Sequence, residues 1–191
     1  MAYLFPRKHS CRWRGMARLW MTLATLILST LAPFARGQQD ERAVRAAFVY
    51  NLTKYVEWPQ TGNELVVGFV GDSDMGGVLE KVLSGKTTDG KTVRVLRNPS
   101  NEQLQRCDIV YIGYSSPKKI QPILEKLRNK SILSVGEDEH FAGSGGIVGL
   151  VRTGDHIQIQ INLEVAQQAG LKISSRLLNL AAIVRTTGAG G

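Results

Sequence analysis

Residues 108–135, with the sequence DIVYIGYSSPKKIQPILEKLRNKSILSV, contain the pattern that decides the fold. The stretch opens with the short apolar run Asp108–Ile112, which is typical of a strand buried on both faces. Residues 117–127 follow with apolar side chains at helical spacing, and Pro117 stands near the start, where a helix tolerates proline. A second apolar run, Ser131–Val135, closes the unit. A strand, a helix and a strand in this order predict two neighbouring parallel strands.

The same alternation continues on both sides of this unit. Strands are expected at 65–70 and 92–96, and helices at 74–83 and 101–106. On the C-terminal side the pattern changes: 147–151 and 156–162 flank Thr153-Gly154, which indicates an antiparallel hairpin. The sequence therefore predicts the α/β class: a single domain, residues 38–186, with a mostly parallel twisted sheet flanked by helices. The antiparallel hairpin lies in its C-terminal part.

A helix is expected at each end of this domain. The first covers Arg42–Trp58, with Asp40 as N-cap and Pro59 as terminator, and it places Asn51 on the apolar stripe as a buried amide. The second is capped by Ser174 or Ser175 and is apolar nearly all round. A helix of that kind is either buried in the core or partly covered by a partner protein.

The composition indicates a globular protein, and the charge is concentrated at the N-terminus. The chain has 191 residues, 43% of them hydrophobic and 21% charged, with a net charge of +8. Six of the 24 basic residues lie in residues 1–37, which contain no acid, so the remainder carries 18 basic and 16 acidic residues and a net charge of +2. Its charges are interspersed, which argues against nucleic acid as a partner.

Residues 1–37 have the pattern of a secretory signal. A cationic segment, Arg7–Arg18, precedes the uncharged apolar run Leu19–Ala35, and small residues at Ala35 and Gly37 suit a signal peptidase. Cleavage is expected after Gly37, or after Ala35 as the second choice, and retention of the segment as an anchor is the alternative. The sequence therefore predicts an exported, periplasmic protein, with residues 187–191 as a disordered tail.

The motifs of catalysis and phosphate binding are incomplete. The segment Gly71–Gly77 has glycines spaced as in a phosphate loop, but Gly77 stands where lysine is needed and Val78 where serine or threonine is needed. Asp72 and Asp74 would also repel an anion, so we interpret them as helix caps. The glycine-rich segment 143–146 precedes a strand and is interpreted as a flexible turn.

Neither cysteine nor histidine completes a recognisable site after residue 37. Cys107 is the only cysteine there and is expected to be a small buried hydrophobe. His140 and His156 belong to no metal-ligand motif. We therefore expect no catalytic residue, no metal and no cofactor, and a protein that is not an enzyme.

Three segments together resemble the YfiR family of periplasmic proteins. They are AVRAAFVYNLTKYVEWP at 43–59, ILSV at 132–135 with FA at 141–142 and GG at 145–146, and IN at 161–162 with AGLKISSRLLNLA at 169–181. The resemblance implies a non-enzymatic periplasmic repressor that binds the periplasmic domain of an inner-membrane diguanylate cyclase or sensor protein, and so controls cyclic di-GMP and biofilm formation.

The same resemblance implies two further associations: an outer-membrane lipoprotein that sequesters the repressor, and a homodimer. Intramolecular disulfides linked to redox sensing are also known in the family. Because Cys107 stands alone, a disulfide switch within one subunit cannot operate here.

Two hypotheses for the binding site follow. For a protein partner, the expected contacts are Leu177, Leu180 and Ile183 on the closing helix, with Trp58 as a second candidate. For the alternative, a periplasmic small-molecule binding protein, the expected crevice lies at the carboxyl ends of the parallel strands. Asp72, Tyr114 and Ser115 would supply its polar groups.

Overall fold

The computed structural model describes residues 32–59, 62–71 and 74–187. The chain divides into two compact units, residues 1–41 and 42–191. Helix α2 (Ala32–Tyr55) contains the last described residues of the first unit and the first residues of the second. Residues 1–31 of the predicted signal lie outside the described residues, while 32–37, with the expected cleavage positions, belong to α2, so the signal stays a prediction. In the part of the chain that is described, no helix is both long enough and apolar enough to cross a membrane.

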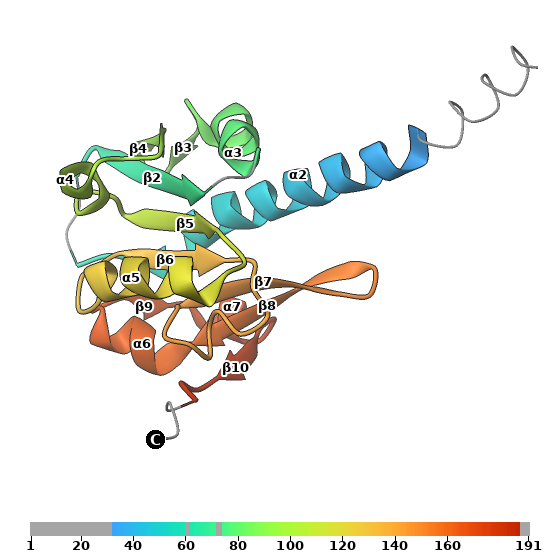
Figure 1. Cartoon of the computed structure of the whole chain (residues 1–191). Helices are drawn as coiled ribbons and strands as arrows, with labels where there is room; N and C mark the ends of the chain where they lie inside the picture. Colours follow the sequence, from blue (N-terminus) through green and yellow to red (C-terminus); the bar gives the residue numbers. More distant parts are fainter. Residues whose placement is uncertain (1–31, 60–61, 72–73, 188–191) are drawn as a thin grey trace, which may run out of the picture. The chain divides into compact units, whose positions relative to one another are not determined.

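The second unit is built around an eight-stranded sheet in the order β10-β8-β7-β6-β5-β2-β4-β3 (Figure 1). A two-stranded antiparallel sheet pairs β1 with β9. In chain order the elements after α2 are β1 (Val56–Glu57), β2 (Glu64–Gly71), α3 (Met75–Leu83), β3 (Thr87–Thr88), β4 (Lys91–Arg97), α4 (Asn101–Leu104), β5 (Ile109–Gly113), α5 (Pro117–Leu127), β6 (Leu133–Gly136), β7 (Val148–Thr153), β8 (His156–Asn162), α6 (Leu163–Gln168), β9 (Lys172–Ile173), α7 (Ser175–Leu178) and β10 (Ala182–Val184).

The sheet is mixed but mostly parallel, as predicted. Strands β4, β2, β5, β6 and β7 run in one direction, each parallel to its neighbour. The predicted hairpin is β7 and β8, which pair antiparallel from Thr153↔His156 to Val148↔Ile161. Strand β10 then pairs parallel to β8, and β3 pairs antiparallel to β4 at the other edge. The predicted fold class is therefore confirmed.

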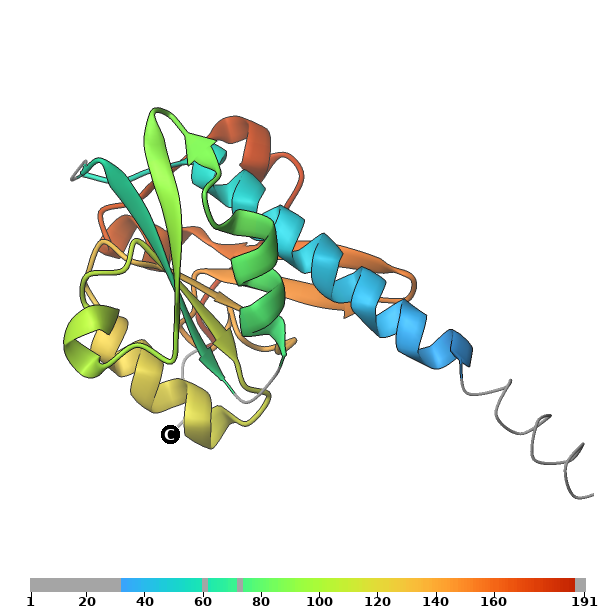
Figure 2. The same cartoon turned by 90° about the horizontal axis from the view of Figure 1, so that it is seen from above.

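The central strand β5 is buried on both faces of the sheet, which explains why its sequence is one apolar run. Ile109 and Tyr111 pack in the core cluster that includes residues of α2 and α3. Val110 and Ile112 pack in a second cluster, with residues of α4 and α5. Figure 2 shows α2 and α3 on one side of the strands and α4 and α5 on the other. Side chains alternate along a strand, so a central strand covered on both faces needs apolar residues at every position.

The opening helix differs from its prediction at both ends. Asp40 lies inside α2 and does not begin it, and the helix ends at Tyr55 because Val56 and Glu57 pair with β9. Asn51 is exposed, so the expected buried amide is wrong. The buried face of α2, which includes Val49 and Leu52, leaves Asn51 outside.

The predicted closing helix begins as expected, with Ser174 as its N-cap, but its predicted length is wrong. Helix α7 ends at Leu178, and residues 182–184 form the strand β10 beside Gln160–Asn162 of β8. The segment is apolar in either conformation, but β-branched Ile183 and Val184 suit a pleated surface, and β8 offers unpaired backbone groups there. Thr187, from the expected tail, donates its backbone N–H to Gly143 O at 3.0 Å, and 188–191 lie outside the described residues.

Candidate functional site

The position predicted for the crevice is at the carboxyl ends of β2 and β5, where the chain changes its direction of progress across the sheet. From β2 the chain continues to β4 on one side and then to β5 on the other, and such a switch point is where doubly wound sheets bind ligands. Here the two backbones approach closely, because a Cβ atom on Gly71 would lie 2.9 Å from the Cα of its partner Gly113. The close approach leaves little room between the strands themselves.

Of the three residues expected to bind a ligand, the structure describes Tyr114 and Ser115. Asp72 lies outside the described residues. Tyr114 is half-buried and Lys119 Nζ lies 4.8 Å from its ring centroid, whereas Ser115 is exposed. A groove of about 290 Å³ does open beside the carboxyl ends of β5 and β6, but neither Tyr114 nor Ser115 lines it. Its lining residues are Pro117, Ile120, Gln121, Asp138, Glu139, His140, Phe141 and Ser144.

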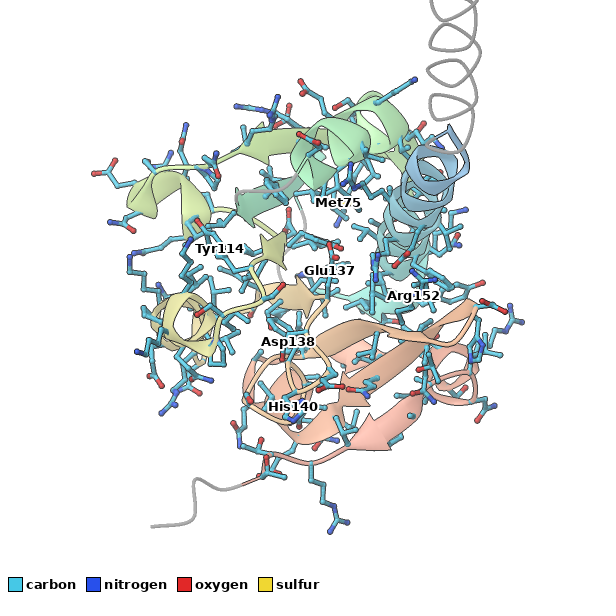
Figure 3. All side chains as sticks on the ribbon, turned by 45° about the vertical axis from the view of Figure 1, so that its right-hand side comes forward. Met75, Tyr114, Glu137, Asp138, His140 and Arg152 are labelled. Carbon is cyan, nitrogen blue, oxygen red and sulfur yellow. The ribbon has the colours of Figure 1, made fainter. Side chains whose placement is uncertain are left out.

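This groove combines polar groups with an apolar floor. Asp138 and His140 follow strand β6, and Figure 3 shows them apart from Tyr114. Asp138 Oδ1 accepts the backbone N–H of His140 at 3.0 Å, which holds the turn. His140 Nδ1 lies 3.5 Å from Glu139 Oε1, with both side chains exposed. Among the described residues no group of His, Cys, Asp and Glu side chains could hold a metal ion.

A buried polar network that the sequence analysis missed lies at the same end of the sheet. Arg45 of α2 is 7% exposed; its Nε donates to Leu150 O at 3.4 Å and its Nη1 lies 3.7 Å from Glu137 Oε2. The hydroxyl of Tyr111, which is fully buried, donates to Glu137 Oε1 at 2.6 Å. The network therefore joins α2 to β5, to the residue after β6 and to β7. The helical spacing of Arg45 with Val49 and Leu52 could have revealed that Arg45 points inward.

Two larger grooves lie elsewhere in the second unit. One, of about 440 Å³, lies between α5 and α6 and is lined by polar side chains such as Gln121, Glu164 and Gln168 over an apolar floor. The other, of about 420 Å³, lies at the amino end of β2 and is lined by Trp58, Thr88 and Lys91 among others. The Oγ1 atom of Thr88 is buried and has no hydrogen-bond partner.

Trp58, which follows β1, contacts the residue just before β5. The indole Nε1 donates to Asp108 O at 3.0 Å, and the half-buried ring packs against the main core cluster. Burial raises the pKa of the Asp108 carboxyl, although Oδ2 accepts the backbone N–H of Val66 at 2.7 Å. Trp58 thus has a structural role, and its contact with a partner stays a prediction.

The three residues predicted on the closing helix are separated. Leu177 is 5% exposed and belongs to the core. Leu180 follows α7 and is 77% exposed, and Ile183 on β10 is 52% exposed. With Val44, they are the exposed large hydrophobic side chains in the described part of the chain. Leu180 and Ile183, here called the exposed apolar pair, lie just before the edge strand β10 and within it, whereas Leu177 lies in the core.

Cys107 is a buried free cysteine, as predicted. Its Sγ lies 3.3 Å from Gln103 O, and burial, with the nearby charge of Asp108, raises the pKa of the thiol to about 11. The thiol therefore stays protonated near neutral pH and is a poor nucleophile.

The strand order and the helices on both faces define a doubly wound α/β protein. The family model described as DUF4154, YfiR/HmsC-like, matches residues 42–182, and the chain belongs to this family. The match begins at Arg42 in α2 and ends at the first residue of β10. It therefore includes all three segments that carried the resemblance.

Comparisons with individual proteins add little to this assignment. No curated protein matches the chain. Among solved structures, the chain is similar to the ABC domain in complex with L-Trp from Streptococcus pneumonia, with 12% identity and a TM-score of 0.43. The match covers 63% of this chain and 55% of that one, so this chain spans about half the length of the other protein.

Proposed function

We propose that this protein is a non-enzymatic periplasmic regulator that binds the periplasmic domain of an inner-membrane signalling protein and represses it. A diguanylate cyclase is the leading partner, and the controlled output is then cyclic di-GMP and biofilm formation. The observation that carries the proposal is membership of the YfiR/HmsC-like family over residues 42–182. In this proposal residues 1–37 direct export and are removed.

The physical mechanism is a shift of populations. A regulator represses a cyclase when it binds the inactive arrangement more tightly than the active one, and the shift equals that difference in affinity. No chemistry on the regulator is needed. An outer-membrane lipoprotein that competes for the regulator would lower its free concentration and release the cyclase, and a homodimer would present the contact surface twice.

The exposed apolar pair, Leu180 and Ile183, is the proposed contact surface. Apolar side chains this exposed bury surface when a partner covers them, and each fully buried Leu or Ile contributes about 1.5–3 kcal/mol. Leu177 is buried in the core, so it is no longer proposed to contact the partner directly. Trp58 is half-buried at the opposite end of the parallel strands and remains a second candidate contact.

The test is genetic and uses a matched control. Deleting the gene is expected to raise cellular cyclic di-GMP, and the wild-type gene is expected to restore it. The double variant Leu180→Asp/Ile183→Asp should fail to restore it, whereas Val44→Asp, which alters an exposed apolar residue on α2, should succeed. Cyclic di-GMP that does not change on deletion under any growth condition would rule out the cyclase as partner.

A second candidate function, small-molecule binding, is favoured by the groove of about 290 Å³ beside the carboxyl ends of β5 and β6. The groove offers Asp138 and His140 next to the apolar side chains of Ile120 and Phe141. A metabolite that raises the melting temperature of the wild-type chain but not of His140→Ala would support this function. A ligand there could also tune the contact with a protein partner.

A further inference from the structure

The two edges of the large sheet differ in how they are protected. Edge strands expose unpaired backbone N–H and C=O groups, and proteins usually block them with charges, proline, short strands or a covering element. At one edge β3 has only two residues, Thr87 and Thr88, and ends in a tight turn with positive φ at Asp89 and Gly90. The hydroxyl of Tyr50 donates to Thr87 O at 3.1 Å. This edge is blocked.

The opposite edge, β10, is also short, with three residues, but its composition protects it less. Its residues Ala182–Val184 include no charge and no proline, and no described strand pairs with their outer side. Ile183 is 52% exposed, and Leu180, just before the strand, is 77% exposed. An uncharged edge strand with exposed apolar side chains is the arrangement to which an extended segment adds as a further strand.

The charges around this edge indicate what kind of segment fits. Residues 165–191 contain no acidic residue, and the exposed Arg176 and Arg185 lie on the two sides of β10 in sequence. Glu164, which in the sequence follows the β8 residues that pair with β10, lines the groove between α5 and α6. A second copy of the same edge would bring its own arginines against these, so a partner of opposite charge fits better.

We propose that β10 binds an extended segment of a partner protein that combines apolar and acidic residues, by addition of that segment as a strand to the sheet edge. Main-chain hydrogen bonds to β10 supply part of the affinity. An apolar side chain of the segment packs on Leu180 and Ile183, and its carboxylates pair with Arg176 and Arg185. The inference rests on the proposed function in one respect, since it places this segment in the periplasmic part of the membrane-anchored partner.

The first test uses three synthetic peptides with blocked ends. One alternates Glu and Val, the second alternates Lys and Val, and the third is the Glu-Val peptide with proline at its centre. Fluorescence anisotropy on the full exported chain is expected to show the Glu-Val peptide binding at least about tenfold more tightly than the Lys-Val peptide, with the proline peptide binding least. Amide hydrogen exchange should slow at residues 182–184 when the Glu-Val peptide binds.

Two variants sharpen this test because both change exposed side chains. Arg185→Glu should reduce the preference for the Glu-Val peptide over the Lys-Val peptide. Ile183→Asp should weaken Glu-Val binding by at least about tenfold, whereas Val44→Asp should leave it unchanged. Equal binding of the Glu-Val and Lys-Val peptides, slowed exchange elsewhere than at β10, or no peptide binding at all would overturn the proposal. Slow exchange at β10 in a peptide-free dimer would show that a second copy closes this edge, and would overturn it as well.

The cellular readout separates this inference from the proposed function. If deletion raises cyclic di-GMP but the Ile183→Asp and Arg185→Glu chains restore it like the wild type, strand addition is wrong and the regulator remains. If deletion leaves cyclic di-GMP unchanged while the peptides bind as expected, strand addition stands and the cyclase is not the partner.

Discussion

Arg45 Nη1 lies 3.7 Å from Glu137 Oε2, and this pair links α2 to the carboxyl end of the sheet. The guanidinium is nearly buried, while the carboxylate is about a third exposed and also accepts the Tyr111 hydroxyl. A buried cation is costly unless carboxylates and hydrogen bonds compensate its charge, and Glu137 supplies part of that compensation. The pair therefore contributes to the position of α2 on the sheet.

We predict that Glu137→Gln lowers the free energy of unfolding by about 1–3 kcal/mol, since it removes the charge that faces Arg45. Tyr111→Phe, which removes only the hydroxyl, should lower it by about 1 kcal/mol. Urea unfolding followed by circular dichroism measures both. Glu139→Gln changes an exposed carboxylate and serves as control, with an expected change within about 0.5 kcal/mol. A loss as large in the control would mean that the Arg45–Glu137 pair has no special role.

The glycine-rich turn packs against an aromatic ring. A Cβ atom on Gly146 or on Gly136 would overlap the ring of Phe141, which is buried. Gly146→Ala is therefore expected to destabilise the fold by about 1–3 kcal/mol through overpacking. Gly77→Ala, in α3 with open space around the new methyl group, should instead stabilise it by about 0.5–1 kcal/mol. Equal effects of the two substitutions on thermal unfolding would contradict this packing argument.

Asn162 is a fully buried amide with all its groups bonded. Its Nδ2 donates to Ala142 O and to Thr186 Oγ1, both at 2.9 Å, and its Oδ1 accepts the backbone N–H of Val165 at 3.2 Å, which caps α6. The residue thus joins the turn after β6, the start of α6 and the segment after β10.

Asn162→Ala should lower the free energy of unfolding by about 2–3 kcal/mol, because it leaves a buried carbonyl and a helix end without these partners. Asn162→Asp keeps the cap but loses both amide donors and buries a charge, so it should cost at least as much. Gln158→Ala, at an exposed position of the same strand, is the control. If Asn162→Asp were as stable as the wild type, the amide donors would be dispensable.

Cys107 should react slowly with alkylating agents in the folded protein. Its thiol pKa is raised from 9.0 to about 11, and two pH units correspond to about a hundredfold smaller thiolate fraction near neutral pH. The rate of reaction with iodoacetamide, followed by mass spectrometry, should therefore be at least about a hundredfold higher in denaturant. Equal rates in the folded and unfolded chains would show that the side chain is neither buried nor protonated as described.

Much of the fold could be predicted from local patterns. The parallel strands β2 and β5 are nearly continuous apolar runs, which are typical of strands covered on both faces. The hairpin of β7 and β8 follows from the alternation of isoleucine with polar residues around Thr153-Gly154. The burial of Cys107 and the cap at Ser100, whose Oγ accepts the N–H of Gln103 at 3.3 Å, agree with residue preferences.

The sequence by itself therefore determined the α/β class, the order of its central elements and the resemblance to the family, because periodicity and capping act over a few residues. Only the tertiary structure decided that residues 182–184 form a strand, that Leu177 is buried while Leu180 and Ile183 are exposed, and that Arg45 meets Glu137. Each of these depends on contacts between segments far apart in the chain. An apolar segment takes whichever conformation its distant neighbours can pair with and cover.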